Sequence, residues 1–177
     1  ANNVCGSSGA LLIPVTVVSG VPVTPSAITG DASVCPGQTE VYSVVNDPSV
    51  LSYSWSIPAG WSGSSASETI TLTAGSLGGT LTVNAVNACG SSSPQSLVLT
   101  VFAPPTVSLN VPADLLCTYS ELYVLSGGSP AGGSYLGTGI TSGVLDPSVP
   151  GLGNLVVGYS YTDANGCAAI GYDNVLI

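Results

Sequence analysis

The five cysteines are the residues of this sequence whose side chains are most able to form covalent bonds or bind metals. Cys35 and Cys89 are about 50 residues apart, as are Cys117 and Cys167, and closing a loop of that size contributes about 3 to 4 kcal/mol on the chain-entropy model. We therefore predict two disulfides, Cys35–Cys89 and Cys117–Cys167, which imply an oxidising compartment. The alternative use of these thiolates is metal binding, for which the sequence offers neither a Cys-x-x-Cys pair nor a histidine.

The nine Asp and Glu residues are the second group of candidates, and they stand in a chain without Lys, Arg or His. Without His, neither a Ser-His-Asp nor a Cys-His arrangement is possible. A pair of carboxylates can hydrolyse glycosides, but these acids are scattered through predicted turns and strand ends. We expect no catalytic residue and no enzymatic activity.

Calcium is the cofactor that these residue types could bind, because hard cations take carboxylate and carbonyl oxygens as ligands. Asp163 and Asn165 beside Gly166 are weakly similar to a calcium loop. The same residue types are what a tight turn requires, and no bidentate Glu follows at loop spacing. We interpret this segment as a turn and predict no cofactor and no metal ligand, with Ca²⁺ as the alternative.

The absence of cations excludes whole classes of function. Nucleic-acid binding depends on Lys and Arg that neutralise phosphates, and recruitment to anionic membrane surfaces depends on basic patches. The mean hydropathy of +0.53 reflects missing charge. The longest apolar stretch, Ala10 to Val18, is broken by Pro14 and is too short to span a bilayer. We expect no nucleic-acid partner and no direct membrane insertion.

The sequence around these residues predicts short β-strands. Abundant Gly, Pro, Ser and Thr disfavour long helices. Alternation of apolar and polar residues predicts strands, each with one face toward a core, at residues 40–45, 52–57, 69–74, 97–102, 106–111 and 121–125. The order Cys35, Trp55, Cys89 is typical of sandwiches that pack a Trp against a disulfide between two sheets. The sequence therefore predicts an all-β fold of antiparallel sandwiches.

Two aromatic residues are candidates for a surface contact. Trp61 follows a Pro-Ala-Gly segment in a predicted loop, where it packs beneath the loop or contacts a ligand. Tyr135 lies in a glycine-rich stretch. An exposed aromatic row that includes both residues would favour a binding module, whereas burial would favour a spacer.

An internal repeat suggests how the chain is divided. Residues 1–8 match residues 85–92 at six of eight positions, and a period of this length in a β-rich chain indicates whole domains in series. We predict the closing strands of a preceding, truncated repeat at 1–23, one sandwich at 24–103 and a second at 104–177. Cys5 then takes the position of Cys89 in the truncated copy, so we expect it to be unpaired in this stretch of chain.

Several runs resemble repeats of large secreted proteins of Bacteroidota. The first module carries YSWSIPAGW at residues 53–61 and TLTVNAVNACG at 80–90, which resemble PKD-like repeats. The second carries GGSYLG at 132–137, LDP at 145–147 and YSYTDANGC at 159–167, which are similar to a companion immunoglobulin-like repeat. The turn rich in Asp and Gly that many PKD domains place after the tryptophan is missing here.

The resemblance implies a surface-exposed protein like the gliding adhesins exported by the type IX secretion system. We therefore expect a stalk or spacer segment of a cell-surface adhesin, internal to a longer precursor. Its expected partners are neighbouring repeats of the same chain, surface polysaccharide or other cell-surface proteins. The alternative is a carbohydrate- or protein-binding accessory module of an exported hydrolase. A chain without Lys or Arg is also expected to resist trypsin-like proteases.

Overall fold

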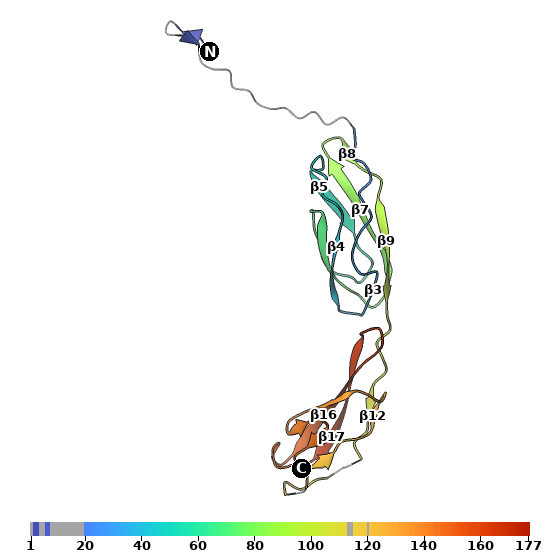
Figure 1. The fold of residues 1–177 in the computed structure, drawn as a ribbon, viewed down its shortest axis with the longest axis vertical. Coiled ribbons are helices and arrows are strands. Elements are labelled where there is room, and N and C mark those ends of the chain that lie inside the picture. Colours follow the sequence, from blue (N-terminus) through green and yellow to red (C-terminus); the bar gives the residue numbers. More distant parts are fainter. Residues whose placement is uncertain (1, 4–5, 8–19, 113–114, 120) are drawn as a thin grey trace.

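The chain forms an all-β structure in the computed structural model, which describes residues 2–3, 6–7, 20–112, 115–119 and 121–177. None of the described residues lies in a helix, so a helix long and apolar enough to cross a membrane is also missing from these ranges. Figure 1 shows two β-rich parts arranged one after the other along the longest axis. Short strands β1 (Asn2–Asn3) and β2 (Gly6–Ser7) pair near the N-terminus.

The first part is a sandwich of two sheets. Its larger sheet has the order β3-β9-β7-β5, and β8 pairs with β7. The smaller sheet pairs β4 with β6. The bounds of these strands are β3 Ser33–Val34, β4 Thr39–Ser43, β5 Ser52–Ser56, β6 Thr69–Thr73, β7 Gly79–Asn87, β8 Gly90–Ser91 and β9 Gln95–Val101.

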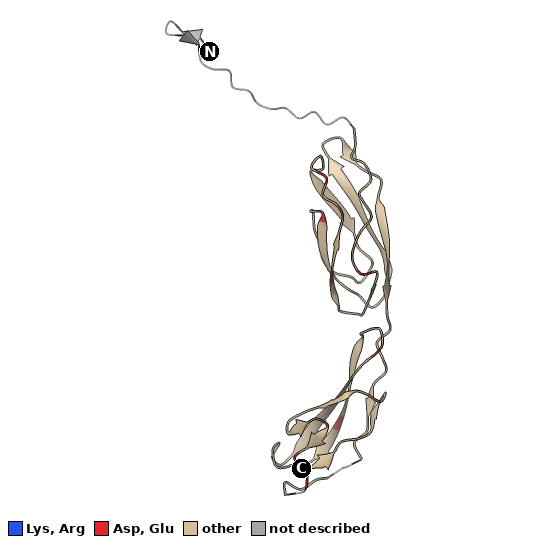
Figure 2. Cartoon of the chain, viewed as in Figure 1, with Lys and Arg blue, Asp and Glu red and all other residues tan. Residues whose placement is uncertain are grey.

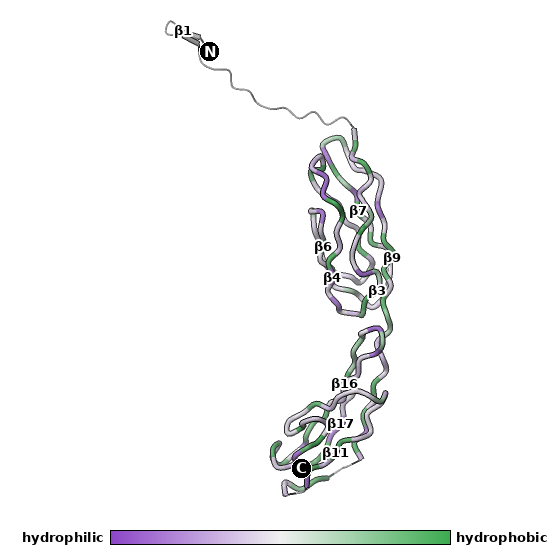
Figure 3. Tube along the Cα trace, in the orientation of Figure 1, coloured by the Kyte–Doolittle hydropathy of each residue, from purple (hydrophilic) through white to green (hydrophobic). Residues whose placement is uncertain are grey.

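Alternation along the strands produces the core of this sandwich. In β6, Ile70 and Leu72 are buried while Thr69 and Thr71 are exposed, as the sequence pattern predicts. Buried residues from both sheets meet in one cluster that includes residues 28, 34, 42, 44, 53, 61, 70, 72, 74, 81, 83, 85 and 99. The hydrophobic segments appear green in Figure 3 and run through both parts of the molecule.

The second part is built on a long hairpin of two nine-residue strands. β16 (Asn154–Thr162) pairs with β17 (Ala168–Leu176) along their whole length, and β13 (Ser134–Leu136) extends the sheet beyond β16. Two small sheets accompany this hairpin, β11-β15-β14 and β10-β12. Their strands are β10 Ser108–Leu109, β11 Tyr123–Val124, β12 Gly128–Ser129, β14 Ile140–Thr141 and β15 Val144–Leu145.

A second, separate hydrophobic core belongs to this part, with buried residues 111, 125, 145, 155, 157, 175 and 177. The expected boundary between residues 103 and 104 falls in the interval between the two cores, and the division into domains stays a prediction. The expected truncated repeat at 1–23 lies mostly outside the described residues, and Cys5 lies wholly outside them.

The expectation that each sandwich carries its own disulfide is wrong. Cys35 is bonded to Cys167, so the disulfide crosses from the first part to the second. Neither Cys35–Cys89 nor Cys117–Cys167 can form in this arrangement. The reason lies in the lengths of β7 and β17, each of which has nine residues.

Candidate functional site

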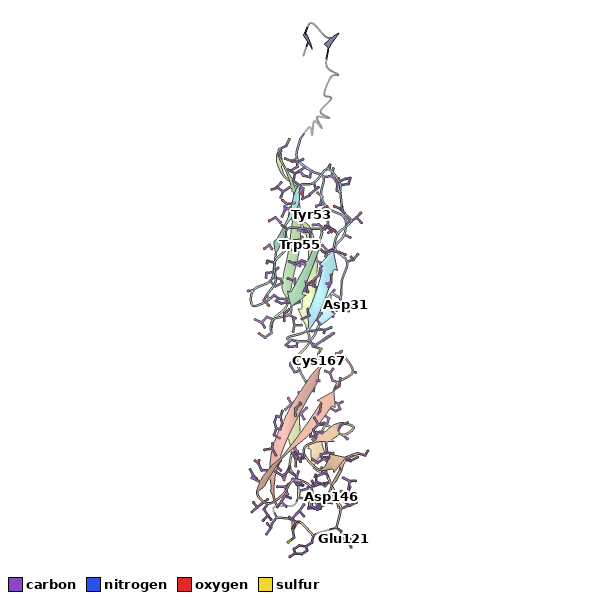
Figure 4. All side chains as sticks on the ribbon, turned by 90° about the vertical axis from the view of Figure 1, so that its left-hand side faces the viewer. Asp31, Tyr53, Trp55, Glu121, Asp146 and Cys167 are labelled. Carbon is purple, nitrogen blue, oxygen red and sulfur yellow. A yellow bond between two sulfur atoms is a disulfide. The ribbon has the colours of Figure 1, made fainter. Side chains whose placement is uncertain are left out.

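A disulfide between Cys35 and Cys167 joins the two parts at their junction. The Cα atoms of Cys35 and Cys167 are separated by 5.4 Å. The bonded residues are 132 positions apart in sequence. Figure 4 places Cys167 between the two parts, at the end of the second part that faces the first.

Cys35 is held at the junction by the strand that precedes it and the turn that follows. Val34 in β3 pairs with Val101 in β9, so Cys35 lies where the larger sheet ends. The Cys35 N–H donates to Oε1 of Gln38 at 3.0 Å, and the Gln38 N–H donates back to the Cys35 carbonyl at 3.1 Å. Gly37 has a φ of 77° in this turn, a conformation that glycine adopts without steric cost.

Cys167 is presented by the turn between β16 and β17. Asp163 Oδ1 accepts hydrogen bonds from the N–H groups of Asn165 and Cys167, each at 2.9 Å. The Asp163 N–H donates to the Cys167 carbonyl at 2.9 Å, which closes the turn. Asp163, Asn165 and Gly166 therefore form the predicted turn, whose carboxylate organises the backbone around the cysteine. Within the described ranges, no three His, Cys, Asp or Glu residues are grouped as a metal site would need.

A second covalent connection crosses the junction beside the disulfide. β9 ends at Val101, and the chain continues through Phe102 toward Pro104 and Pro105. The Phe102 N–H donates to the Val34 carbonyl at 2.9 Å, so this connection begins next to Cys35. Two covalent crossings at one end of the sandwich restrict rotation and bending between the parts far more than a single linker does.

The two predicted pairings fail because each would span a whole strand. Cys89 follows β7 at Asn87, whereas Cys35 lies near the Gly79 end of β7, and nine residues of strand cover about 30 Å. Cys117 lies beside Leu176, since the Leu116 N–H donates to the Leu176 carbonyl, whereas Cys167 precedes Ala168 at the other end of β17. A disulfide needs Cα atoms within about 7 Å. Cys89 and Cys117 are both exposed.

The position of Cys167 directly after a predicted turn is a sequence signal against the Cys117–Cys167 pairing, but it does not identify Cys35 as the partner. Cys167 directly follows the turn of the β16–β17 hairpin and precedes β17, so it lies at one tip of the second part. Leu115 and Leu116 align with Leu176, at the other tip. Strand length, combined with loop position, therefore argues against a bond between Cys117 and Cys167.

Trp61 is not a surface residue. Its side chain is 6% exposed and belongs to the first core, and its Nε1–H donates to the Leu77 carbonyl at 2.9 Å. Tyr135 is half-buried against the second core. Its ring centroid lies 4.8 Å from that of Tyr159, and its hydroxyl accepts from the Gly128 N–H at 3.1 Å. These two aromatics lie in different parts of the molecule and form no common row.

Two carboxylates stabilise equivalent turns far from the junction. Asp47 Oδ1 accepts from the Ser49 hydroxyl at 2.7 Å and the Ser49 N–H at 2.8 Å. Asp146 Oδ1 accepts from the Ser148 hydroxyl at 2.6 Å and the Ser148 N–H at 3.0 Å. In each turn the serine hydroxyl, followed by the serine N–H, lowers the pKa of the aspartate. These Asp-Pro-Ser segments stabilise loops. Their two aspartates lie in different parts of the molecule and do not form a pair.

One tyrosine of the first core has a perturbed hydroxyl. Tyr42 is fully buried, and its hydroxyl donates to the Asp31 carbonyl at 2.9 Å. Burial, with smaller contributions from Glu40 and Asp31, raises the pKa of Tyr42. Each of these effects disfavours the tyrosinate, so the hydroxyl remains a donor that fixes the segment leading to Cys35.

Comparison with known families agrees with the geometry of the first part. Residues 21–99 match the family model described as a PKD-like domain. This range covers the first hydrophobic core and all seven strands of its two sheets up to Leu99 in β9. No match was found among curated proteins.

Proposed function

Since the chain carries a PKD-like domain at residues 21–99, we propose that it is an extracellular structural spacer. In this proposal it forms part of the stalk of a bacterial cell-surface adhesin and holds an adhesive or motility-related region away from the cell. The similarity of its motifs to repeats of Bacteroidota proteins supports export through the type IX system. The proposal assigns the chain no enzymatic role.

The observation that carries this proposal is the covalent junction. Domains joined by a single linker move relative to one another by default. Here the Cys35–Cys167 disulfide and the segment that contains Pro104 and Pro105 connect the same two ends. Such a joint transmits orientation from one part to the next, which a spacer requires and a freely tethered binding module does not.

The packing of the two tryptophans also favours a spacer over a carbohydrate-binding module. Sugar-binding platforms need exposed aromatic faces, whereas Trp61 is buried and Trp55 packs partly buried against the same core. The Trp55 Nε1–H donates to the Ser67 carbonyl at 2.9 Å, which fixes its ring against the structure. Both tryptophans therefore stabilise the sandwich.

The disulfide also supports an extracytoplasmic location. Structural disulfides persist in oxidising compartments and are rare in the cytosol of mesophiles. Nine acidic side chains without any Lys or Arg would keep a spacer soluble and self-repelling on a crowded surface. Figure 2 shows the acidic positions spread over both parts.

Solution scattering of the full chain tests the spacer directly. We expect the oxidised protein to give the profile of an elongated particle in which the two parts keep one relative orientation. The Cys35→Ser/Cys167→Ser variant should give a broader distribution of interatomic distances, because only the linker then joins the parts. A compact particle, or identical profiles for the two proteins, would contradict the proposal.

A replacement experiment tests the role within the adhesin. Exchanging residues 21–177 for an unrelated two-domain rod of similar length should preserve adhesion of cells that carry the full-length protein. A shorter replacement should weaken adhesion, because the distal region then lies closer to the cell. Loss of adhesion with the length-matched rod, together with binding of the isolated chain to surface polysaccharide, would show a binding module instead.

A further inference from the structure

We infer that the Cys35–Cys167 disulfide makes residues 20–177 a tether of limited extension, in which tension along its length bypasses most of both hydrophobic cores. The inference goes beyond the proposed spacer role, because it concerns how the covalent chain carries force. It follows from the positions of the two cysteines relative to the ends of the two parts.

The segment from Gly20 to Cys35 runs the length of the first sandwich. At its start, the Gly20 carbonyl accepts from Nδ2 of Asn87 at 3.1 Å, next to the last residue of β7. At its finish, Val34 pairs with Val101, near the opposite end of β7 where Gly79 pairs with Leu99. Figure 1 shows this blue segment passing from one end of the first part to the other. Figure 4 places Asp31, near the end of this segment, close to the junction.

β17 runs the length of the second part in the same way. Ala168, which follows Cys167, pairs with Thr162 at the junction end of the hairpin. Leu176 pairs with Asn154 at the far end, and the chain reaches Ile177 there. The shortest covalent path from Gly20 to Ile177 therefore passes along one edge of each part and crosses between them through the two sulfurs.

The lengths show how little this path can stretch. The path contains the segments Gly20–Cys35 and Cys167–Ile177, which reach at most about 90 Å when fully extended. The long axes of the two sandwiches already account for more than about 60 Å of this, since each nine-residue strand covers about 30 Å. The two cysteines are separated by 132 residues. Fully extended, this stretch of chain would cover about 450 Å, and the disulfide prevents it from extending.

Most of both cores therefore lies outside the path of the force. Residues between Cys35 and Cys167 form a closed loop and supply every strand from β4 to β16. Both ends of β17 belong to the path, so pulling on them stretches β17 along its own axis and does not peel it from β16. If either core opened, the ends of the molecule would move apart only by the small slack left in the path.

Single-molecule force spectroscopy on the full chain tests this inference. Handles are attached to both ends by peptide-tag ligation, because thiol coupling would involve the cysteines. We expect the oxidised protein to show no unfolding step that releases more than a few tens of ångströms from residues 20–177. After reduction with dithiothreitol, unfolding should release about 450 Å more.

The Cys35→Ser/Cys167→Ser variant is the matched control. It should behave like the reduced wild-type protein, and dithiothreitol should not increase its extension further. Should this variant fail to fold, the comparison of oxidised with reduced wild type still decides the question. Steps of about 200 Å or more in the oxidised protein, the size expected for opening one part, would overturn the inference. Such steps would leave the elongated shape seen by scattering intact, so the tether and the spacer proposals fail separately.

Discussion

The two tryptophans donate their indole N–H groups to backbone carbonyls within the same sandwich. Trp55 reaches the Ser67 carbonyl and Trp61 the Leu77 carbonyl, each at 2.9 Å. A buried indole needs such a partner, because an unpaired polar group in a core is costly. The space around Trp61 is tight, since a Cβ added to Gly75 would lie 3.2 Å from its ring.

Replacement of Trp61 should therefore affect stability. We expect Trp61→Ala to lower the free energy of unfolding by about 3 to 5 kcal/mol, through lost burial and the cavity left behind. Trp61→Phe should cost less, because it keeps an aromatic ring and loses mainly the N–H donor. Urea unfolding followed by circular dichroism measures both variants. An unchanged unfolding midpoint for Trp61→Ala would show that the ring does not stabilise the core.

The Asp-Pro-Ser turns at Asp47 and Asp146 predict how stability depends on pH. Bonds from serine lower the pKa of both aspartates below the ordinary value of 3.8. A folded-state pKa below the unfolded one stabilises the protein above the unfolded pKa, and this contribution is lost as pH falls through the folded pKa. Both carboxylates are exposed, so solvent screens the effect.

We expect the wild type to lose stability as the pH falls below about 4 more steeply than the Asp47→Asn/Asp146→Asn variant does. The variant retains an oxygen acceptor in each turn but cannot titrate there. Urea unfolding midpoints at neutral pH and at several acidic pH values make the comparison. Parallel pH profiles for the two proteins would show that these turns do not contribute.

Strand length determines which cysteines can meet. β7 separates Cys35 from Cys89, and β17 separates Cys117 from Cys167, so each expected pair lies at opposite ends of its part. The same geometry brings Cys35 and Cys167 to facing ends, where the 5.4 Å between their Cα atoms suits a disulfide. The disulfide thus joins two elements that belong to different cores.

Removal of this bond should weaken the fold as a whole. We expect Cys35→Ser/Cys167→Ser to lower stability by about 4 to 5 kcal/mol when both parts unfold together, because a very long loop is no longer closed in the unfolded state. Thermal unfolding of the variant and of the reduced wild type should agree. Chymotryptic mapping of the oxidised protein should yield a linked pair of peptides that contain Cys35 and Cys167. A Cys35–Cys89 peptide pair would contradict the arrangement.

All of the charged side chains of the molecule are negative. Nine acidic groups face no Lys, Arg or His, so every ordered carboxylate interaction described above is a hydrogen bond to a hydroxyl or a backbone N–H. A chain of this composition also presents no peptide bond that trypsin-like proteases recognise. This would protect an exposed spacer irrespective of its fold.

Digestion of unfolded protein separates this chemical resistance from folding. We expect pure trypsin to leave the reduced, urea-unfolded chain intact, because trypsin cleaves after Lys or Arg and the chain contains neither. Chymotrypsin should digest the same sample at its Tyr, Trp, Phe and Leu residues, which controls for accessibility. Gel electrophoresis and mass spectrometry measure the products. Trypsin cleavage of the unfolded chain would rule out the protection.

Several strands and one turn could be predicted from the sequence. Alternation at residues 52–57 and 69–74 predicted strands and their buried faces, because side chains in a strand point to opposite faces with a period of two. The turn at Asp163 was predicted from residue types that a tight turn requires. The missing cations argued against nucleic-acid binding without any structural information, because that chemistry depends on charge.

The cysteine pairing and the burial of the aromatic residues depend on the tertiary packing. Cysteine spacing measures distance along the chain, whereas a disulfide depends on distance in space, which β7 and β17 set at about 30 Å for each expected pair. Likewise, the Pro-Ala-Gly segment before Trp61 predicted a loop but not which way the indole points. Both answers depend on how separate elements pack, which no local pattern encodes.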